Sequence, residues 1–170
     1  MRLKSALRRG VAAAVIAGIV VSSGIPAYAK TWDIAAGDIT VKGESDGSGK
    51  YNKVKQGDNE FEKDEGETVI TSMSGKSEEH TVTIDTSGGN VDVTFDDLKI
   101  DVSGKGEAAV TVKGGGDATI ELDGDNELKS GGYHAGLEKN DERSEGGETI
   151  SGKLTIKDDN DTKGSLTAEG

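Results

Sequence analysis

The chain has 170 residues, of which 32 are acidic and 20 are basic, so its formal net charge at pH 7 is −12. An acidic surface of this kind repels nucleic-acid phosphates and anionic lipid, which argues against both as partners. The absence of cysteine excludes disulfide bonds and a lipid anchor attached to cysteine.

Residues 1–29 have the composition of a signal peptide. A basic start is followed by an apolar run that is short for a membrane span, and Ala27-Tyr28-Ala29 forms a small-residue cleavage pattern. We expect cleavage after Ala29, a secreted protein and no membrane insertion after cleavage; an uncleaved anchor is the alternative. Removal of Arg2, Lys4, Arg8 and Arg9 lowers the 20 basic residues to 16, against 32 acidic residues, for a net charge of −16.

Alternating apolar and polar residues predict short strands along the rest of the chain. In chain order, the expected strands are 38–43, 67–72, 80–85, 90–104, 108–114, 118–131, 152–161 and 164–170. Glycine, aspartate and asparagine separate them, as is typical of tight turns. High charge with few aromatics resembles a disordered chain, but regular β-branched alternation favours order, with a polar, partly flexible segment at 43–66.

Two stretches of the chain resemble each other. When "VTFDDLKIDVSG" (93–104) is laid over "IELDGDNELKSG" (120–131), apolar positions match at shifts of 27 and 28. A third copy begins at "LTIKDD" and places Leu154 on Ile120, a shift of 34. We attribute the longer third interval to a polar loop insertion at 140–151.

Three short strands in each repeat are typical of a parallel β-helix. The sequence therefore predicts an all-β, parallel β-helix with short strands; an antiparallel β-sandwich is the alternative. The expected parts are a signal peptide at 1–29, an N-terminal capping region at 30–79, and β-helix coils at 80–170 that continue beyond the chain's end. The predicted core residues are Val91, Val93, Phe95, Ile100, Val102, Val110, Val112, Ile120, Leu122, Leu128, Leu137, Leu154, Ile156 and Leu166.

The chain also resembles a known group of proteins. The stretches that carry the resemblance are 90–140, "GKLTI" (152–156), "GSLTAEG" (164–170) and "WDIAAGDITV" (32–41). Over about residues 31–42 and 80–170 they are similar to repeat coils of secreted or surface β-helical proteins of Gram-positive bacteria, described as carbohydrate-binding-domain-like. The resemblance implies a right-handed parallel β-helix, export, and a role at the cell surface with extracellular or cell-wall polysaccharide as partner. Characterised relatives resemble polysaccharide lyases in fold and bind acidic or cellulosic glycans with calcium.

Clustered aspartates give the only cofactor prediction. Acidic turns occupy equivalent positions of the repeats, and stacking would bring them within several Å of one another, near the strand spacing of about 4.8 Å. Calcium prefers six to eight hard oxygen ligands, which carboxylates and turn carbonyls supply. The alternative is that aspartate serves turn geometry alone. The calcium candidates are Asp96, Asp97, Asp123, Asp125 and Asp158.

No catalytic residue is predicted. His134 lies near Tyr133, Glu138 and Ser130, but the Ser-Gly pair recurs at 103–104 without a histidine, so we interpret it as a turn between strands. The expected function is a non-catalytic secreted or cell-surface module that binds carbohydrate. The alternatives are a purely structural stalk or adhesin-like repeat and, less favoured, a polysaccharide lyase. The basic candidates for a lyase are Lys99, Lys113, Lys129 and Arg143.

Overall fold

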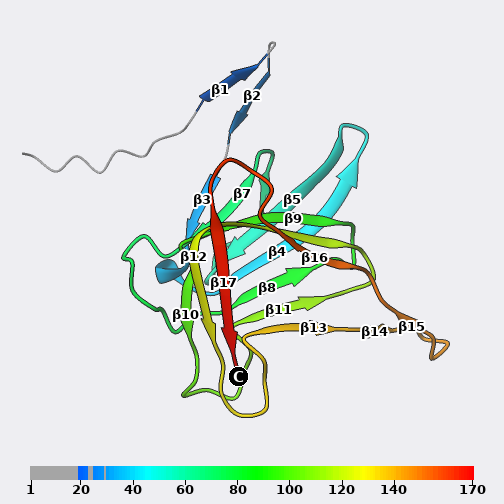
Figure 1. Ribbon diagram of the computed structural model, residues 1–170. Coiled ribbons are helices and arrows are strands. Elements are labelled where there is room, and N and C mark those ends of the chain that lie inside the picture. The colour runs from blue at the N-terminus through cyan, green and yellow to red at the C-terminus, as the bar shows by residue number, and fades with distance from the viewer. Residues whose placement is uncertain (1–18, 23–24, 29) are drawn as a thin grey trace, which may run out of the picture.

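The computed structural model describes residues 19–22, 25–28 and 30–170 (Figure 1). The predicted signal peptide lies largely outside this part of the chain. Its two described pieces, β1 (Ile19–Ser22) and β2 (Ile25–Tyr28), pair in antiparallel orientation. Within the described residues, no helix is long and apolar enough to cross a membrane.

Seven strands form a parallel sheet in which every strand pair is parallel. The long strand β12 lies at its centre, because its first half pairs with β9 and β16 and its second half with β10 and β17. The strands are β3 (Lys30–Asp33), β7 (Thr68–Thr71), β9 (Val91–Asp96), β10 (Lys99–Asp101), β12 (Ala118–Lys129), β16 (Leu154–Lys157) and β17 (Gly164–Glu169).

Six strands form a mixed sheet in the order β13-β11-β8-β4-β5-β6. The first four are parallel neighbours, whereas β4, β5 and β6 form an antiparallel meander. The strands are β4 (Ile39–Asp46), β5 (Gly49–Gln56), β6 (Glu62–Asp64), β8 (Val82–Asp85), β11 (Val110–Lys113) and β13 (Leu137–Asn140). The remaining elements are the short 3₁₀ helix η1 (Ile34–Ala36) and a hairpin of β14 (Glu142–Arg143) and β15 (Thr149–Ile150), which extends away from both sheets (Figure 1).

One hydrophobic core fills the space between the two sheets. Alternation along each strand sends every second side chain into it, so Phe95 and Ile120 are fully buried while Asp92 lies on the outer face. The core prediction is confirmed for Val91, Val93, Phe95, Ile100, Val102, Val110, Val112, Ile120, Leu122 and Leu128, which are buried, and Leu137, Leu154 and Leu166 pack against them.

Ile156 does not fit the core prediction, because 43% of its surface is exposed. It is paired with the fully buried Ile120 but lies on β16, which pairs only with β12 among the described strands. Besides Ala108, Ala109 and Ala118, the sequence also left out nine larger buried hydrophobic residues, most of them in the first half of the chain. These are Trp32, Ile34, Ile39, Val41, Val54, Ile70, Val82, Ile84 and Leu98.

The predicted right-handed parallel β-helix is wrong. The strands form one parallel and one mixed sheet, and neither closes into a solenoid. The physical reason lies in the segment 39–64, where two turns fold the chain back into an antiparallel meander instead of a coil. Two sheets around one core agree in layering with the alternative, a β-sandwich, although most strand pairs here are parallel.

The internal repeat reflects parallel pairing within one sheet. Val93 pairs with Ile120 at the predicted shift of 27, and Ile100 pairs with Leu128 at the predicted shift of 28. The third copy was misaligned, since Leu154 pairs with Ala118, a shift of 36 in place of 34. A two-residue slip leaves the same side chains facing inward, so alternation alone does not reveal it.

Candidate functional site

A polar groove lies on the outer face of the parallel sheet. Its floor is built by side chains that alternate with the core residues of β9, β12 and β16. Asp92 is paired with Thr119 across the first two strands. One step further along the strands, Thr94 is paired with Glu121, which is paired in turn with Lys157. In-register parallel pairing thus gives two rows of polar side chains that run across the strands.

Two segments form the walls of this groove, whose volume is about 650 Å³. On one side are Lys50, Tyr51 and Asn52 of β5, together with the turn at 66–67. On the other side is the loop after β16, at 158–160. The walls come from both sheets, so the groove depends on how the β5 hairpin is fixed against the parallel sheet.

Buried hydrogen bonds hold the β5 wall in place. The side-chain amide of Asn52 donates to Thr68 Oγ1 at 2.9 Å and to the Asp92 carbonyl at 2.8 Å. The Thr68 hydroxyl donates to Asp64 Oδ2 at 3.0 Å, and the Trp32 indole N–H donates to the same oxygen at 3.1 Å. These contacts join β5 and β6 to three strands of the parallel sheet and leave the buried Asp64 carboxylate hydrogen bonded.

Glu121 lies at the bottom of the groove and is only 8% exposed. Its Oε1 accepts the backbone N–H groups of Asp159 at 2.9 Å and Asn160 at 3.3 Å, which fixes the loop wall. Its Oε2 lies 2.8 Å from Lys157 Nζ. The Lys157 ammonium lowers the pKa of Glu121 to about 2; the two N–H groups act in the same direction, while burial opposes them. The carboxylates of Asp159 and Glu121 in turn raise the pKa of Lys157.

The groove also contains a second carboxylate and an aromatic ring. The hydroxyl of Thr94 on β9 donates to Oε1 of Glu67, the residue just before β7, at 2.6 Å. The Tyr51 hydroxyl donates to Glu44 Oε2 at 3.2 Å, and Lys63 Nζ lies 4.3 Å from the centre of the Tyr51 ring. Both contacts restrain the tyrosine at the rim.

Three of the five predicted calcium candidates lie together at the turn between β9 and β10. Asp96 is paired with Asp123, and the backbone N–H of Asp97 donates to the Asp123 carbonyl at 3.1 Å. Burial raises the pKa of Asp96, and the charges of Asp97 and Asp123 raise it further. Repulsion of this kind is what a bound cation would relieve.

The other two candidates accept hydrogen bonds, as Asp97 does from the N–H of Asp125 and Asp123 from the side-chain amide of Asn160. Asp125 Oδ1 accepts the Ser165 hydroxyl at 2.8 Å, and Asp158 Oδ1 accepts the backbone N–H of Gly164 at 3.2 Å. Among the described residues, no group of three or more histidine, aspartate or glutamate side chains is arranged to hold a metal ion. A calcium site therefore remains a prediction from the sequence.

The corner at 130–138 is held by Ser130 and not by the histidine. Ser130 Oγ accepts the backbone N–H of Ala109 at 2.9 Å and donates to the Ala135 carbonyl at 3.0 Å. His134 Nδ1 lies 3.0 Å from Glu138 Oε2. Both contacts of the serine hydroxyl are thus to the backbone, and the histidine ring contacts the Glu138 carboxylate instead.

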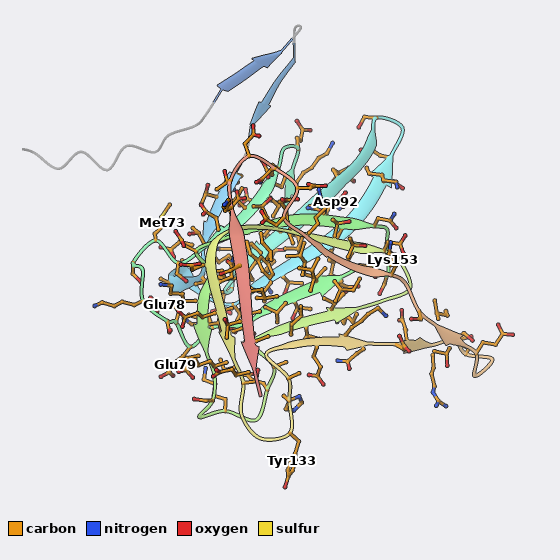
Figure 2. All side chains as sticks on the ribbon, viewed as in Figure 1. Met73, Glu78, Glu79, Asp92, Tyr133 and Lys153 are labelled. Carbon is orange, nitrogen blue, oxygen red and sulfur yellow. The ribbon has the colours of Figure 1, made fainter. Side chains whose placement is uncertain are left out.

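The basic residues considered for a lyase are dispersed. Lys99 and Lys129 belong to the parallel sheet, Lys113 belongs to the mixed sheet, and Arg143 lies in the β14–β15 hairpin. The residues that line the groove include none of the four. Tyr133, at the tip of the corner loop, extends fully into solvent (Figure 2).

Sequence reasoning missed the groove entirely. The available signal was the outward row at 94 and 121, which the repeat shift of 27 already relates. The missing information was the pairing of β16, because the shift of 34 placed Thr155 and not Lys157 beside Glu121. The wall at 50–52 could not be inferred from the repeat, since β5 has no counterpart in it.

The described chain is thus an all-β protein of two packed sheets with a polar groove on the outer face of one of them. Comparison with protein-family models, with curated proteins and with solved structures gave no match in any of the three. The resemblance to Gram-positive surface repeat proteins therefore stays an expectation from the sequence.

Proposed function

We propose that this protein is an exported, non-catalytic module that binds a carbohydrate in the groove over β9, β12 and β16. The observation that carries the proposal is the pair of polar rows on the groove floor. Hydroxyl, carboxylate and ammonium groups alternate there, and these are the donors and acceptors that sugar hydroxyls pair with. The partner would be an extracellular or cell-wall polysaccharide, in line with the signal peptide expected at 1–29.

The spacing of the rows supports a polymeric ligand. Neighbouring strands lie about 4.8 Å apart, close to the length of one β-1,4-linked pyranose unit. A glycan that crosses the strands would meet Asp92, Thr119 and then Thr155 at successive sugars, because these three residues are paired in register. Tyr51 at the rim adds an aromatic side chain, the usual apolar partner of a sugar ring.

The proposal is tested by filling the groove. Thr119 is half-buried on the groove floor, so Thr119→Trp would occupy the space while both rows keep their backbone positions. We expect the affinity for a bound glycan to fall at least about tenfold, equivalent to ~1.4 kcal/mol. The measurement is isothermal titration of the mature chain with oligosaccharides that a glycan array selects.

Thr111→Trp is the matched control. Thr111 is also half-buried and lies on the outer face of the mixed sheet, where it is paired with Thr83. The control should bind like the parent chain. Equal binding by the Thr119→Trp and parent proteins would contradict the groove as the site, and no binding of any glycan would favour the structural stalk. Titration with calcium and with a chelator tests the predicted cation separately.

A further inference from the structure

The charge of the groove indicates which class of sugar the proposed binding site would prefer. Four carboxylates and two ammonium groups line the groove. Lys157 is shared by two of these carboxylates, Glu121 at 2.8 Å and Asp159 at 2.6 Å. The groove as a whole thus has an excess of two negative charges. It also belongs to a chain whose mature part carries a net charge of −16 once the four basic residues before Ala29 are removed.

The carboxylates differ in what they already bind. Glu67 accepts a hydrogen bond from Thr94 at 2.6 Å. Asp92 is exposed on the groove floor, and within the described part of the chain its side chain has no hydrogen-bond or ion-pair partner (Figure 2). It is fixed in place nevertheless, because its carbonyl accepts the Asn52 amide at 2.8 Å and its strand is paired on both sides.

A second acceptor faces the same space. Glu121 Oε2 is buried and forms no hydrogen bond within the described part of the chain, since its contact with Lys157 is an ion pair without hydrogen-bond geometry. Buried acceptors in this state favour a donor brought by a ligand. The charge of Glu121 is already balanced by Lys157, so its oxygen favours only an N–H or O–H donor, whereas the unpaired Asp92 favours positive charge.

We propose that the groove selects glycans with protonated amino groups, that is, polymers of free hexosamine, over neutral glycans and over uronates. This inference rests on the proposed function of the groove. An ammonium at Asp92 would form a charge-assisted hydrogen bond, while the neighbouring hydroxyl of Thr119 would pair with a ring hydroxyl. A uronate carboxylate in the same position would meet like charge in a chain that is strongly negative.

The test uses four hexasaccharides with one titration protocol: glucosamine, N-acetylglucosamine, cellohexaose and galacturonate. The inference predicts about tenfold tighter binding of the glucosamine oligomer than of either neutral one, with galacturonate weakest. The preference should shrink as salt is raised, because the Debye length falls to about 3 Å at 1 M.

Asp92→Asn should lower the affinity for the glucosamine oligomer about fivefold and affect the neutral oligomers less, so that the preference for glucosamine shrinks. Asp58→Asn, at an exposed turn outside the groove, is the matched control and should bind like the parent. Binding of neutral oligomers without preference for glucosamine would overturn this inference and leave the proposed function intact. Tighter binding of galacturonate would also overturn it, whereas no binding of any oligomer would remove the proposed function itself.

Discussion

Strand β12 contains two acidic regions that use their polar groups in opposite ways. In its first half, Thr119 and Glu121 form the floor of a groove beside the exposed Asp92. In its second half, the turn at 123–126 consists of polar residues and a glycine. The sequence alone favours this turn as a functional site, because it predicts calcium binding there. There the side chains bind the backbone instead. Asp97 Oδ1 accepts the N–H of Asp125 at 2.9 Å.

The difference arises from the course of the backbone. Along the groove, β9 and β12 pair residue for residue, so side chains stand in rows on an open face. At the turn, β12 has one residue more than the neighbouring chain of β9 and β10, because the pairing shift changes from 27 to 28. Gly124 takes up the extra residue with a φ of +63°, and the carboxylate of Asp97 fills the place of its missing side chain. The density of acidic residues thus does not distinguish the two regions; the unused hydrogen-bonding capacity of Asp92 beside a cavity does.

The largest expected effect is at Asn126, which holds the turn. It is 1% exposed; its Oδ1 accepts the N–H of Leu98 at 2.9 Å, and its Nδ2 donates to the carbonyls of Asp123 and Ser165, each at 3.0 Å. Asn126→Ala leaves the buried N–H of Leu98 without its partner and removes two further hydrogen bonds, so it should lower the free energy of unfolding by about 3 kcal/mol. Urea denaturation followed by circular dichroism measures the loss.

Asn59→Ala, at an exposed turn, provides the control and should change stability by less than about 0.5 kcal/mol. If Asn126→Ala proves as stable as this control, the turn is not held by side-chain hydrogen bonds. The contrast with the groove would then fail, since the acidic residues of the turn would be as available as those of the groove.

A smaller effect with a distinct pH signature is expected for Glu121→Gln in the groove. The pKa of this carboxyl is lowered from 4.5 to about 2, so the folded protein favours the charged form. The stabilisation is therefore complete above about pH 4.5 and is lost as the pH falls toward about 2. The variant should be less stable than the parent at pH 7, and the two urea midpoints should converge between these pH values.

Glu60→Gln, on the exposed stretch before β6, should give a pH profile parallel to that of the parent chain. A constant difference between Glu121→Gln and the parent across this pH range would show that Glu121 acts through packing and not through its charge. The groove floor would then resemble the turn, where polar groups serve structure alone.

Much of the strand pattern was accessible from the sequence. The predicted strands at 80–85 and 108–114 contain β8 and β11, because both alternate strictly and end at turn residues. Strand β5 was missed, since its inward positions include Asn52, a polar residue that is buried only because Thr68 and the Asp92 carbonyl satisfy it. The hydrogen bond from Asn52 to the Asp92 carbonyl joins residues that are 40 positions apart, so no pattern of neighbouring residues predicts it.

The β-helix prediction failed for a related reason. Recurring apolar positions report which strands are neighbours, as the pairing of Val93 with Ile120 confirms. They do not report the path that the chain takes between neighbours, and the meander of β4, β5 and β6 has no counterpart in the repeat. The candidate site depends on this meander, because β5 forms one wall of the groove.

The smallest effect is expected at Asp96 in the turn, and it tests the calcium prediction. Burial and the neighbouring charges of Asp97 and Asp123 raise the pKa of Asp96, so the charged form opposes folding at pH 7 and protonation relieves the repulsion as the pH falls. In chelator at pH 7, Asp96→Asn should therefore be more stable than the parent, by about 0.5 kcal/mol or less. With calcium added, the parent should gain stability and the variant should gain less, because a ligand that binds only the folded state stabilises it. If added calcium does not change the urea midpoint of the parent chain, the acidic turn has only a structural role. The groove is then the only candidate site on β12.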